Sequence, residues 1–118
     1  MDKEELAWAG GLFEGEGTIG CWRNTGGRHF QFVSRLMITD EDVIYRFVDA
    51  VRDLVFLQVH EAKRLYGSEK KIRYTVSTSN YKSTSSLING LWPYLGQRHR
   101  NQYEDALLKY QEWSKPLY

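Results

Sequence analysis

The sequence predicts an α+β protein whose elements follow the order helix, strand, strand, helix, strand, strand, helix, helix. Two kinds of periodicity support this prediction. Four segments carry apolar residues at helical spacing, and two pairs of alternating segments flank short turns that contain glycine. A length of 118 residues fits a single domain, residues 1–118, with one modest core.

The first helix is expected to begin after Asp2, because Asp2 and Glu5 have the spacing of a capping box. Its apolar face contains Leu6, Trp8, Ala9, Leu12 and Phe13. A second stripe is almost free of side chains until its last member, and consists of Ala7, Gly10, Gly11 and Glu14. Each glycine inside a helix costs roughly 1 kcal/mol relative to alanine, so we expect another backbone to approach this stripe closely. Gly17 is expected to end the helix.

Two hairpins are expected to form the four strands of an antiparallel sheet. The first joins residues 18–24 and 28–39 through a turn at 25–27, and the second joins 55–65 and 71–79 through a turn at 66–69. Alternation predicts an inward set in the second strand, Phe30, Phe32, Ser34, Leu36 and Ile38. The outward set is His29, Gln31, Val33, Arg35 and Met37. In the fourth strand, Ile72, Tyr74 and Val76 alternate with Arg73, Thr75 and Ser77.

Three further helices complete the predicted layout. Asp40 can cap the second, whose apolar stripe is Val43, Ile44, Phe47, Val48 and Val51. Asn80 can cap the third, whose stripe is Leu87, Ile88, Leu91, Trp92 and Leu95, with Pro93 perturbing its end. The last helix, about residues 100–113, carries Tyr103, Ala106, Leu107 and Tyr110 on one face.

Composition excludes several classes of protein. No run of eighteen apolar residues and no signal peptide are present, so we expect a soluble, intracellular protein without a membrane partner. The single cysteine, Cys21, excludes an internal disulfide and a cysteine-rich zinc site. His29, His60 and His99 are scattered, and we expect no metal role for them. The strand segments carry net positive charge and the first two helices net negative charge. A basic sheet face suits a polyanion, although a solvated mixed surface explains the charge equally well.

The stretch Ala9 to Gly17, AGGLFEGEG, resembles the nine-residue signature of the LAGLIDADG homing endonucleases. The matching positions are Gly11, Leu12, Gly15 and Gly17, and the two acid positions hold Glu14 and Glu16. Residues 91–98, LWPYLGQR, resemble the family's segment between its third and fourth helices, which leads to a basic residue, usually Lys; here it is Arg98. The element order also matches, so the resemblance covers essentially the whole chain.

This resemblance implies a saddle-shaped, four-stranded antiparallel sheet that straddles double-stranded DNA. It implies a site-specific, double-strand DNA endonuclease that depends on Mg²⁺, with Mn²⁺ or Ca²⁺ able to replace it for binding. Because the motif occurs once, a homodimer acting on a long, near-palindromic site is expected. The dimer interface is then the stripe Ala7, Gly10, Gly11 and Glu14. Glu16 is the expected metal ligand, together with the main-chain carbonyl of Gly15.

Three residues are expected to act in catalysis: Glu16, Arg98 and Asp40. Arg98 cannot act as a base because its guanidinium is never deprotonated, but it can stabilise negative charge in the transition state. Asp40 resembles a family position that often orders water, and it is equally well explained as a helix cap. Glu14 is expected to be structural. The expected DNA-binding residues lie on the outward strand faces: Trp22, Asn24, Gln31, Arg35, His60, Arg64, Arg73, Thr75 and Ser77.

Two function classes therefore remain. The first is the endonuclease, encoded in an intron or free-standing, and the second is a cleavage-deficient nucleic-acid binding protein on the same fold, such as an intron maturase or a regulator. The acid at Glu16 and the cation at Arg98 favour the first. The motif and layout together argue against an ordinary small interaction domain. The Met start and the lack of splice-junction residues argue against an intein.

Overall fold

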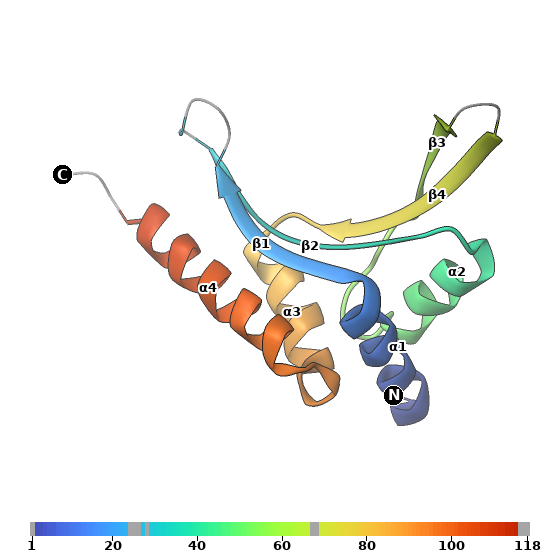
Figure 1. The fold of residues 1–118 in the computed structure, drawn as a ribbon. Coiled ribbons are helices and arrows are strands. Elements are labelled where there is room, and N and C mark those ends of the chain that lie inside the picture. Colours follow the sequence, from blue (N-terminus) through green and yellow to red (C-terminus); the bar gives the residue numbers. More distant parts are fainter. Residues whose placement is uncertain (1, 24–26, 28, 67–68, 116–118) are drawn as a thin grey trace.

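Four helices cover one face of a four-stranded antiparallel sheet in the computed structural model, which describes residues 2–23, 27, 29–66 and 69–115 (Figure 1). The side chains of residues 64–66, 69 and 70 are outside this description. The elements are α1 (Lys3–Glu16), β1 (Gly17–Arg23), β2 (Phe30–Ile38), α2 (Glu41–Ala50), β3 (His60–Tyr66), β4 (Glu69–Thr78), α3 (Tyr81–Leu91), the short 3-10 helix η1 (Trp92–Tyr94) and α4 (Gln97–Trp113). No helix in the described part of the chain is long and apolar enough to cross a membrane.

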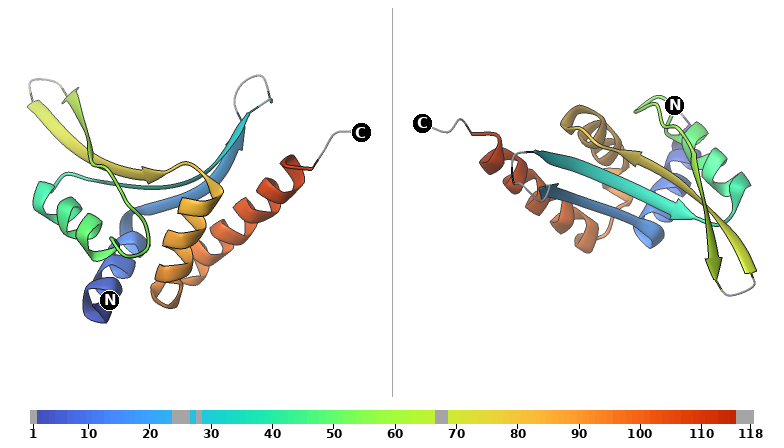
Figure 2. Two further views of the ribbon diagram at one scale, coloured as in Figure 1. Left: turned by 180° about the vertical axis from the view of Figure 1, so that it is seen from behind. Right: turned by 90° about the horizontal axis from the view of Figure 1, so that it is seen from above.

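The sheet has the strand order β1-β2-β4-β3, so the two hairpins join through their second strands. Figures 1 and 2 show the strands curving into a saddle, with the outer ends of both hairpins raised and all four helices beneath the convex face. The upper, concave face has no helix over it. The predicted α+β fold class and its saddle-shaped antiparallel sheet are therefore confirmed.

Some predicted boundaries are wrong. The third strand begins at His60 rather than near residue 55, because Leu57 is drawn into the core and the chain from 55 to 59 crosses to the sheet without pairing. The third helix ends at Leu91, and Pro93 lies in the following 3-10 turn. The last helix begins at Gln97, earlier than residue 100. The predicted turns fall partly on residues 25, 26, 67 and 68, outside the described residues.

Asp2 caps α1 as predicted, because its Oδ1 accepts hydrogen bonds from the backbone N–H groups of Glu4 and Glu5 at 3.0 and 3.1 Å. The reciprocal half of the capping box does not form. The Glu5 carboxylate instead accepts two hydrogen bonds from Arg46 of α2, at 3.0 and 2.7 Å. These bonds lower the pKa of Glu5. The Arg46 guanidinium also lies 3.9 Å from the ring centre of Trp8, so this group links α1 to α2.

Gly17 follows the last residue of α1, as the sequence predicts, but it does not use the left-handed conformation common at helix ends. Its φ is −82°, an extended value open to any residue. A Cβ at this position would lie 2.6 Å from ring atoms of Phe13. Glycine is therefore required here because the buried Phe13 ring occupies the space that a side chain would need.

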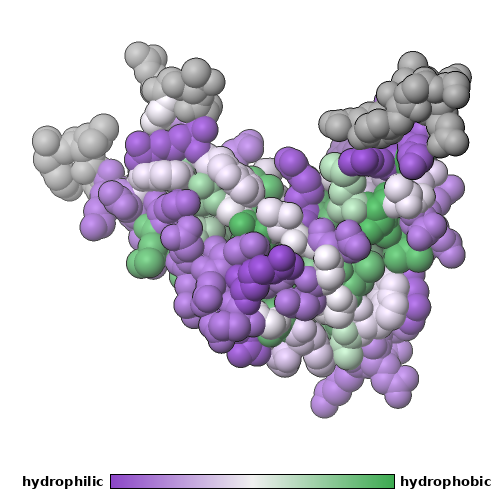
Figure 3. Space-filling view, viewed as in Figure 1, coloured by the Kyte–Doolittle hydropathy of each residue, from purple (hydrophilic) through white to green (hydrophobic). Residues whose placement is uncertain are grey.

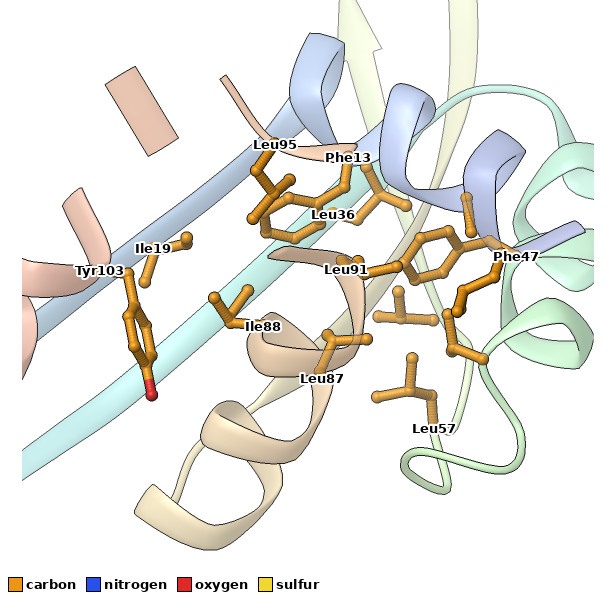
Figure 4. Close-up of a cluster of buried hydrophobic side chains, with 14 of the residues drawn as sticks. Phe13, Ile19, Leu36, Phe47, Leu57, Leu87, Ile88, Leu91, Leu95 and Tyr103 are labelled. Atoms are coloured by element: carbon orange, nitrogen blue, oxygen red, sulfur yellow. The ribbon is translucent and has the colours of Figure 1, made fainter. Parts of the chain in front are cut away.

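The core lies between the convex face of the sheet and the four helices (Figure 4). Its largest buried side chains come from every layer and include Phe13, Leu36, Phe47, Leu87, Ile88 and Leu91. The predicted inward set of β2 is confirmed for Phe32, Ser34 and Leu36, which are buried. Val33 belongs to the predicted outward set and lies on that face, yet it is buried. It pairs with Gly20, over which the Trp22 ring lies, so an apolar surface surrounds it on the open side.

A chain of buried hydroxyl groups joins β2, β4 and α3. Thr84 donates to the backbone carbonyl of Phe32 at 2.9 Å, so its oxygen accepts the hydroxyl proton of Thr78 at 2.7 Å. The Thr78 oxygen in turn accepts from the hydroxyl and the backbone N–H of Ser34, at 2.5 and 3.2 Å. Every hydroxyl in the chain thus has a partner, which is the condition for burying polar groups at low cost.

We predict that Thr84→Val destabilises the fold by about 1–3 kcal/mol, because it keeps the side chain's shape and leaves Thr78 without its acceptor. Thr84→Ser is the matched control, since it keeps the hydroxyl and loses one methyl group, worth about 0.8 kcal/mol. Urea unfolding of both variants measures the difference. A valine variant at least as stable as the serine variant would contradict the hydroxyl chain.

Candidate nucleic-acid interface and active site

The strand register brings the predicted DNA-binding residues to one face of the sheet. Residues paired across antiparallel strands share a face, and Trp22 pairs with Gln31 while Arg35 pairs with Ser77. Other pairs on this face are His60 with Thr75, Thr75 with Met37, and Ala62 with Arg73. This is the concave face that no helix covers (Figure 2).

Exposure on this concave face follows the prediction. Trp22, Gln31, Arg35, His60 and Ser77 are exposed, whereas Arg73 and Thr75 are half-buried. Asn24 and the side chain of Arg64 lie outside the described residues. Figure 3 shows the hollow between the two raised hairpin ends in a space-filling view.

Two exposed residues of the same face were missed by the sequence reading. Thr18 pairs with Arg35, and Lys71 pairs with Arg64. The alternation that identified Trp22 and Arg73 would have found both, had it been extended by a few residues along each strand. They add one hydroxyl and one ammonium donor to the concave face.

Trp22 is the large apolar side chain of this surface, 52% exposed. A Cβ on Gly20 would overlap the six-membered ring of Trp22, so the indole lies back along β1 over the glycine. The ring is therefore held along the strand. It presents a broad apolar surface on the concave face.

Glu16, the last residue of α1, is exposed and directly precedes β1, an edge strand of the sheet. It lines a depression of about 400 Å³ together with Asp40 and Arg73. The other lining residues are Leu12, Met37, Ile38, Thr39 and Val43. The structure thus brings two of the three predicted catalytic residues to one depression, next to a basic residue of the DNA-binding set.

Asp40 occupies the N-cap position of α2 without capping it through its side chain. Its backbone carbonyl accepts from Ile44 at 3.1 Å, whereas its carboxylate makes no capping hydrogen bond. The alternative that Asp40 is a side-chain helix cap therefore lacks the hydrogen bond that it requires. The carboxylate belongs to the depression that also contains Glu16.

Arg98 is the second residue of α4 and is exposed, but it is not among the residues that line this depression. Its neighbour in the chain, His99, is completely buried. Glu14 points toward the start of the same helix, where its Oε2 accepts a hydrogen bond from the backbone N–H of Gly96 at 2.8 Å. This contact agrees with the expectation that Glu14 is structural.

The stripe predicted as a dimer interface divides into two parts. Gly10 is buried, and a Cβ there would overlap the Cβ of Tyr94 in η1, so its lack of a side chain has a reason within this chain. Gly11 is exposed, with nothing within 4 Å of an added Cβ, and Gly15 has the same surroundings. The open side of α1 is therefore formed by Gly11 and Gly15 at i, i+4, with half-buried Ala7 beside them.

The oxygen donors at the end of α1 fit a magnesium ion. The last four carbonyl groups of a helix, Gly15 among them, have no partner within the helix, and Glu16 is exposed beside them. No group of three or more His, Cys, Asp or Glu residues that could enclose a metal occurs in the described part of the chain. Magnesium is commonly held by one or two carboxylates together with substrate phosphates, so an open site of this kind is sufficient.

Comparison with solved structures finds the same fold in a homing endonuclease. The structure is similar to that of the homing endonuclease I-CvuI in complex with a DNA target in the presence of magnesium, in which the DNA was not cleaved. The TM-score is 0.60 at 13% sequence identity, and the match covers 96% of this chain and 68% of the other. No family model matches the sequence, and no curated protein sequence matches it. The chain thus has a homing endonuclease fold.

Proposed function

We propose that this protein is a site-specific DNA endonuclease that acts as a homodimer with magnesium, of the LAGLIDADG type that its motif resembles. The observation that carries the proposal is one depression lined by Glu16, Asp40 and Arg73, so that two acids lie beside a basic residue of the open, concave sheet face. The fold likeness to a homing endonuclease in complex with DNA supports the same function.

The concave face suits DNA because its side chains can both attract the phosphates and read the bases. Cationic side chains such as Arg35 and Arg73 attract phosphates, a contribution that weakens as salt increases. In the major groove, arginine matches guanine and glutamine matches adenine, so Arg35 and Gln31 can also read bases. The exposed Trp22 surface can contact thymine methyl groups. Such a face combines positioning and sequence reading.

Hydrolysis of a phosphodiester requires a water nucleophile and stabilisation of the charge that develops on phosphate. Glu16 and the Gly15 carbonyl are the ligands proposed for magnesium, which when bound supplies positive charge at the phosphate. Asp40 faces the same depression and can accept a hydrogen bond from the attacking water. Arg98 contributes a fixed positive charge for the transition state. Each protomer would then cut one strand.

The homodimer is proposed to form along the open side of α1, through Ala7, Gly11 and Gly15. A two-fold axis there uses the same surface of both protomers, and the absent side chains let two helices approach closely. The two Glu16 carboxylates would then lie near the axis, one for each strand. Gly10 and Glu14, which the sequence also predicts at this interface, have contacts within the protomer.

Glu16→Gln should abolish cleavage and leave binding nearly intact, because the amide keeps the shape but removes the charge that the metal requires. We expect a loss of at least about 100-fold in cleavage rate, the scale seen when a group that stabilises transition-state charge is removed. The substrate is a duplex selected from a randomised library by the wild-type protein. Cleavage is measured with Mg²⁺ and binding with Ca²⁺.

Glu4→Gln, at the exposed start of the same helix, is the control and should cut normally. Near-wild-type cutting by Glu16→Gln would remove Glu16 from the site. A wild-type protein that binds its selected duplex and never cuts it would instead identify a binding protein on this fold.

Arg35→Ala should weaken DNA binding by about 1–3 kcal/mol if the side chain reaches a base. Arg52→Ala is a matched control, because Arg52 is exposed in the turn that follows α2, and α2 lies beneath the convex face of the sheet (Figure 1). Gel-shift titrations at several salt concentrations distinguish a contact with a base from a contact with a phosphate. Loss of a base contact lowers the affinity by an amount that depends on the DNA sequence, and loss of a phosphate contact lowers it uniformly, with a shallower salt dependence. Equal binding by both variants would show that the concave face does not carry the DNA.

Gly11→Leu should leave the protomer folded and abolish dimerisation, cleavage and tight binding together, because Gly11 has open space within the chain. Gly10→Ala should behave differently, since its Cβ meets Tyr94 and overpacking costs about 1–3 kcal/mol of stability. Analytical ultracentrifugation and urea unfolding distinguish the two effects. A Gly11→Leu protein that remains dimeric would place the dimer interface elsewhere.

A further inference from the structure

His99 is a completely buried polar side chain that the proposed reaction does not use directly. Its Nε2 lies 2.8 Å from the carbonyl oxygen of Gly17. Because a carbonyl can only accept, the ring nitrogen must carry the proton and donate. The edge of the ring also packs against Phe13, with 5.7 Å between ring centres. The imidazole is therefore fixed in both position and orientation.

The second ring nitrogen of His99 meets the motif helix. Nδ1 lies 2.9 Å from Oε2 of Glu14. The geometry of this contact is not that of a hydrogen bond. The same carboxylate oxygen accepts from the backbone N–H of Gly96, the N-cap residue of α4. A Cβ on Gly96 would lie only 2.7 Å from Oε1 of Glu14. Glu14 thus caps α4 from another helix and places a negative charge at its positive end.

The positions of these contacts in the chain relate two charged residues of the proposed site. Arg98 directly precedes His99, and Glu16 directly precedes Gly17. Consecutive Cα atoms are about 3.8 Å apart. Arg98 and Glu16 are both exposed and come from different helices, α4 and α1. The hydrogen bond from His99 to Gly17 therefore joins the residues that follow them in the chain.

We propose that His99 is a positioning residue that sets the distance between Arg98 and Glu16, with Glu14 fixing the start of α4 from the other side. The expected effect on cleavage rests on the proposed endonuclease function, whereas the effect on the distance between Arg98 and Glu16 does not. His99 touches neither DNA nor the reacting atoms. Its effect reaches the phosphate through the placement of the Arg98 charge, and a misplacement of about 1 Å can cost roughly 100-fold in rate.

Two substitutions separate the contacts of His99. His99→Gln can place an amide N–H where Nε2 is, so it keeps the donor to Gly17. His99→Leu fills a similar volume and removes both polar contacts. We expect the leucine variant to lower the single-turnover cleavage rate by about 10- to 100-fold with little change in Kd, and the glutamine variant to restore most of the rate. Thr84→Val serves as a control for lost stability away from this site.

A double-mutant cycle tests whether His99 acts through Arg98. If it does, His99→Leu lowers the cleavage rate in the wild-type background and causes no further loss in an Arg98→Ala background. An equal loss in both backgrounds, or no loss in either, would overturn the proposal. A loss of rate in Thr84→Val as large as that in His99→Leu would also overturn it, since stability alone would then explain the effect.

A distance measurement tests the geometry without any cleavage. Spin labels on Glu16→Cys and Arg98→Cys should give one narrow distance distribution, which His99→Leu broadens and His99→Gln leaves narrow. Cys21 is buried, and burial raises the pKa of its thiol, so it should react slowly with the label. Excess unlabelled protein removes distances between protomers. An unchanged distribution in His99→Leu would refute the positioning role, whereas a wild type that cuts no DNA would refute the endonuclease and leave this measurement valid.

Discussion

The packing of α1 against residues 94–99 is the constraint on which the arrangement of the site depends. Three contacts at successive turns hold the two segments together: Gly10 leaves room for Tyr94, Glu14 accepts from Gly96, and the Gly17 carbonyl accepts from His99. Two of the three need glycine to let backbone and side chain approach. Because α1 continues into β1 without a loop, fixing α1 also fixes the first strand of the sheet.

The same packing explains which side of α1 remains free. With Gly10 and Glu14 turned inward, the helix presents Gly11 and Gly15 outward, and its last residue, Glu16, lines the depression that also contains Asp40 and Arg73. One side of the helix packs on η1 and α4, its end contributes an acid to the depression beside Asp40, and its open side carries no bulky side chain.

The fold could be predicted from sequence to a large extent, because each element carries its own periodic or capping signal. The stripe of α2, the cap at Asp2 and the alternation in β2 all describe local geometry, and all are found in the structure. Burial and one strand boundary were not predicted. Val33 is buried on the outward face that its alternation predicts, beside Gly20 and Trp22 of the neighbouring strand. Leu57 lies in the core, and β3 begins only at His60.

By itself, the sequence determined the order of the elements, the face on which Gln31, Arg35 and Ser77 lie, and the placement of Glu16 at the end of a helix. Spacing alone carries this information, since helix and strand periods fix which residues share a face. Tertiary structure decided which neighbour each face meets. Contacts between residues more than eighty positions apart decide three features. Gly10 is buried against Tyr94 while Gly11 stays open, Glu14 turns toward Gly96, and His99 is buried beside Gly17. No local pattern encodes such pairings, because they arise only when the sheet and helices close around one core.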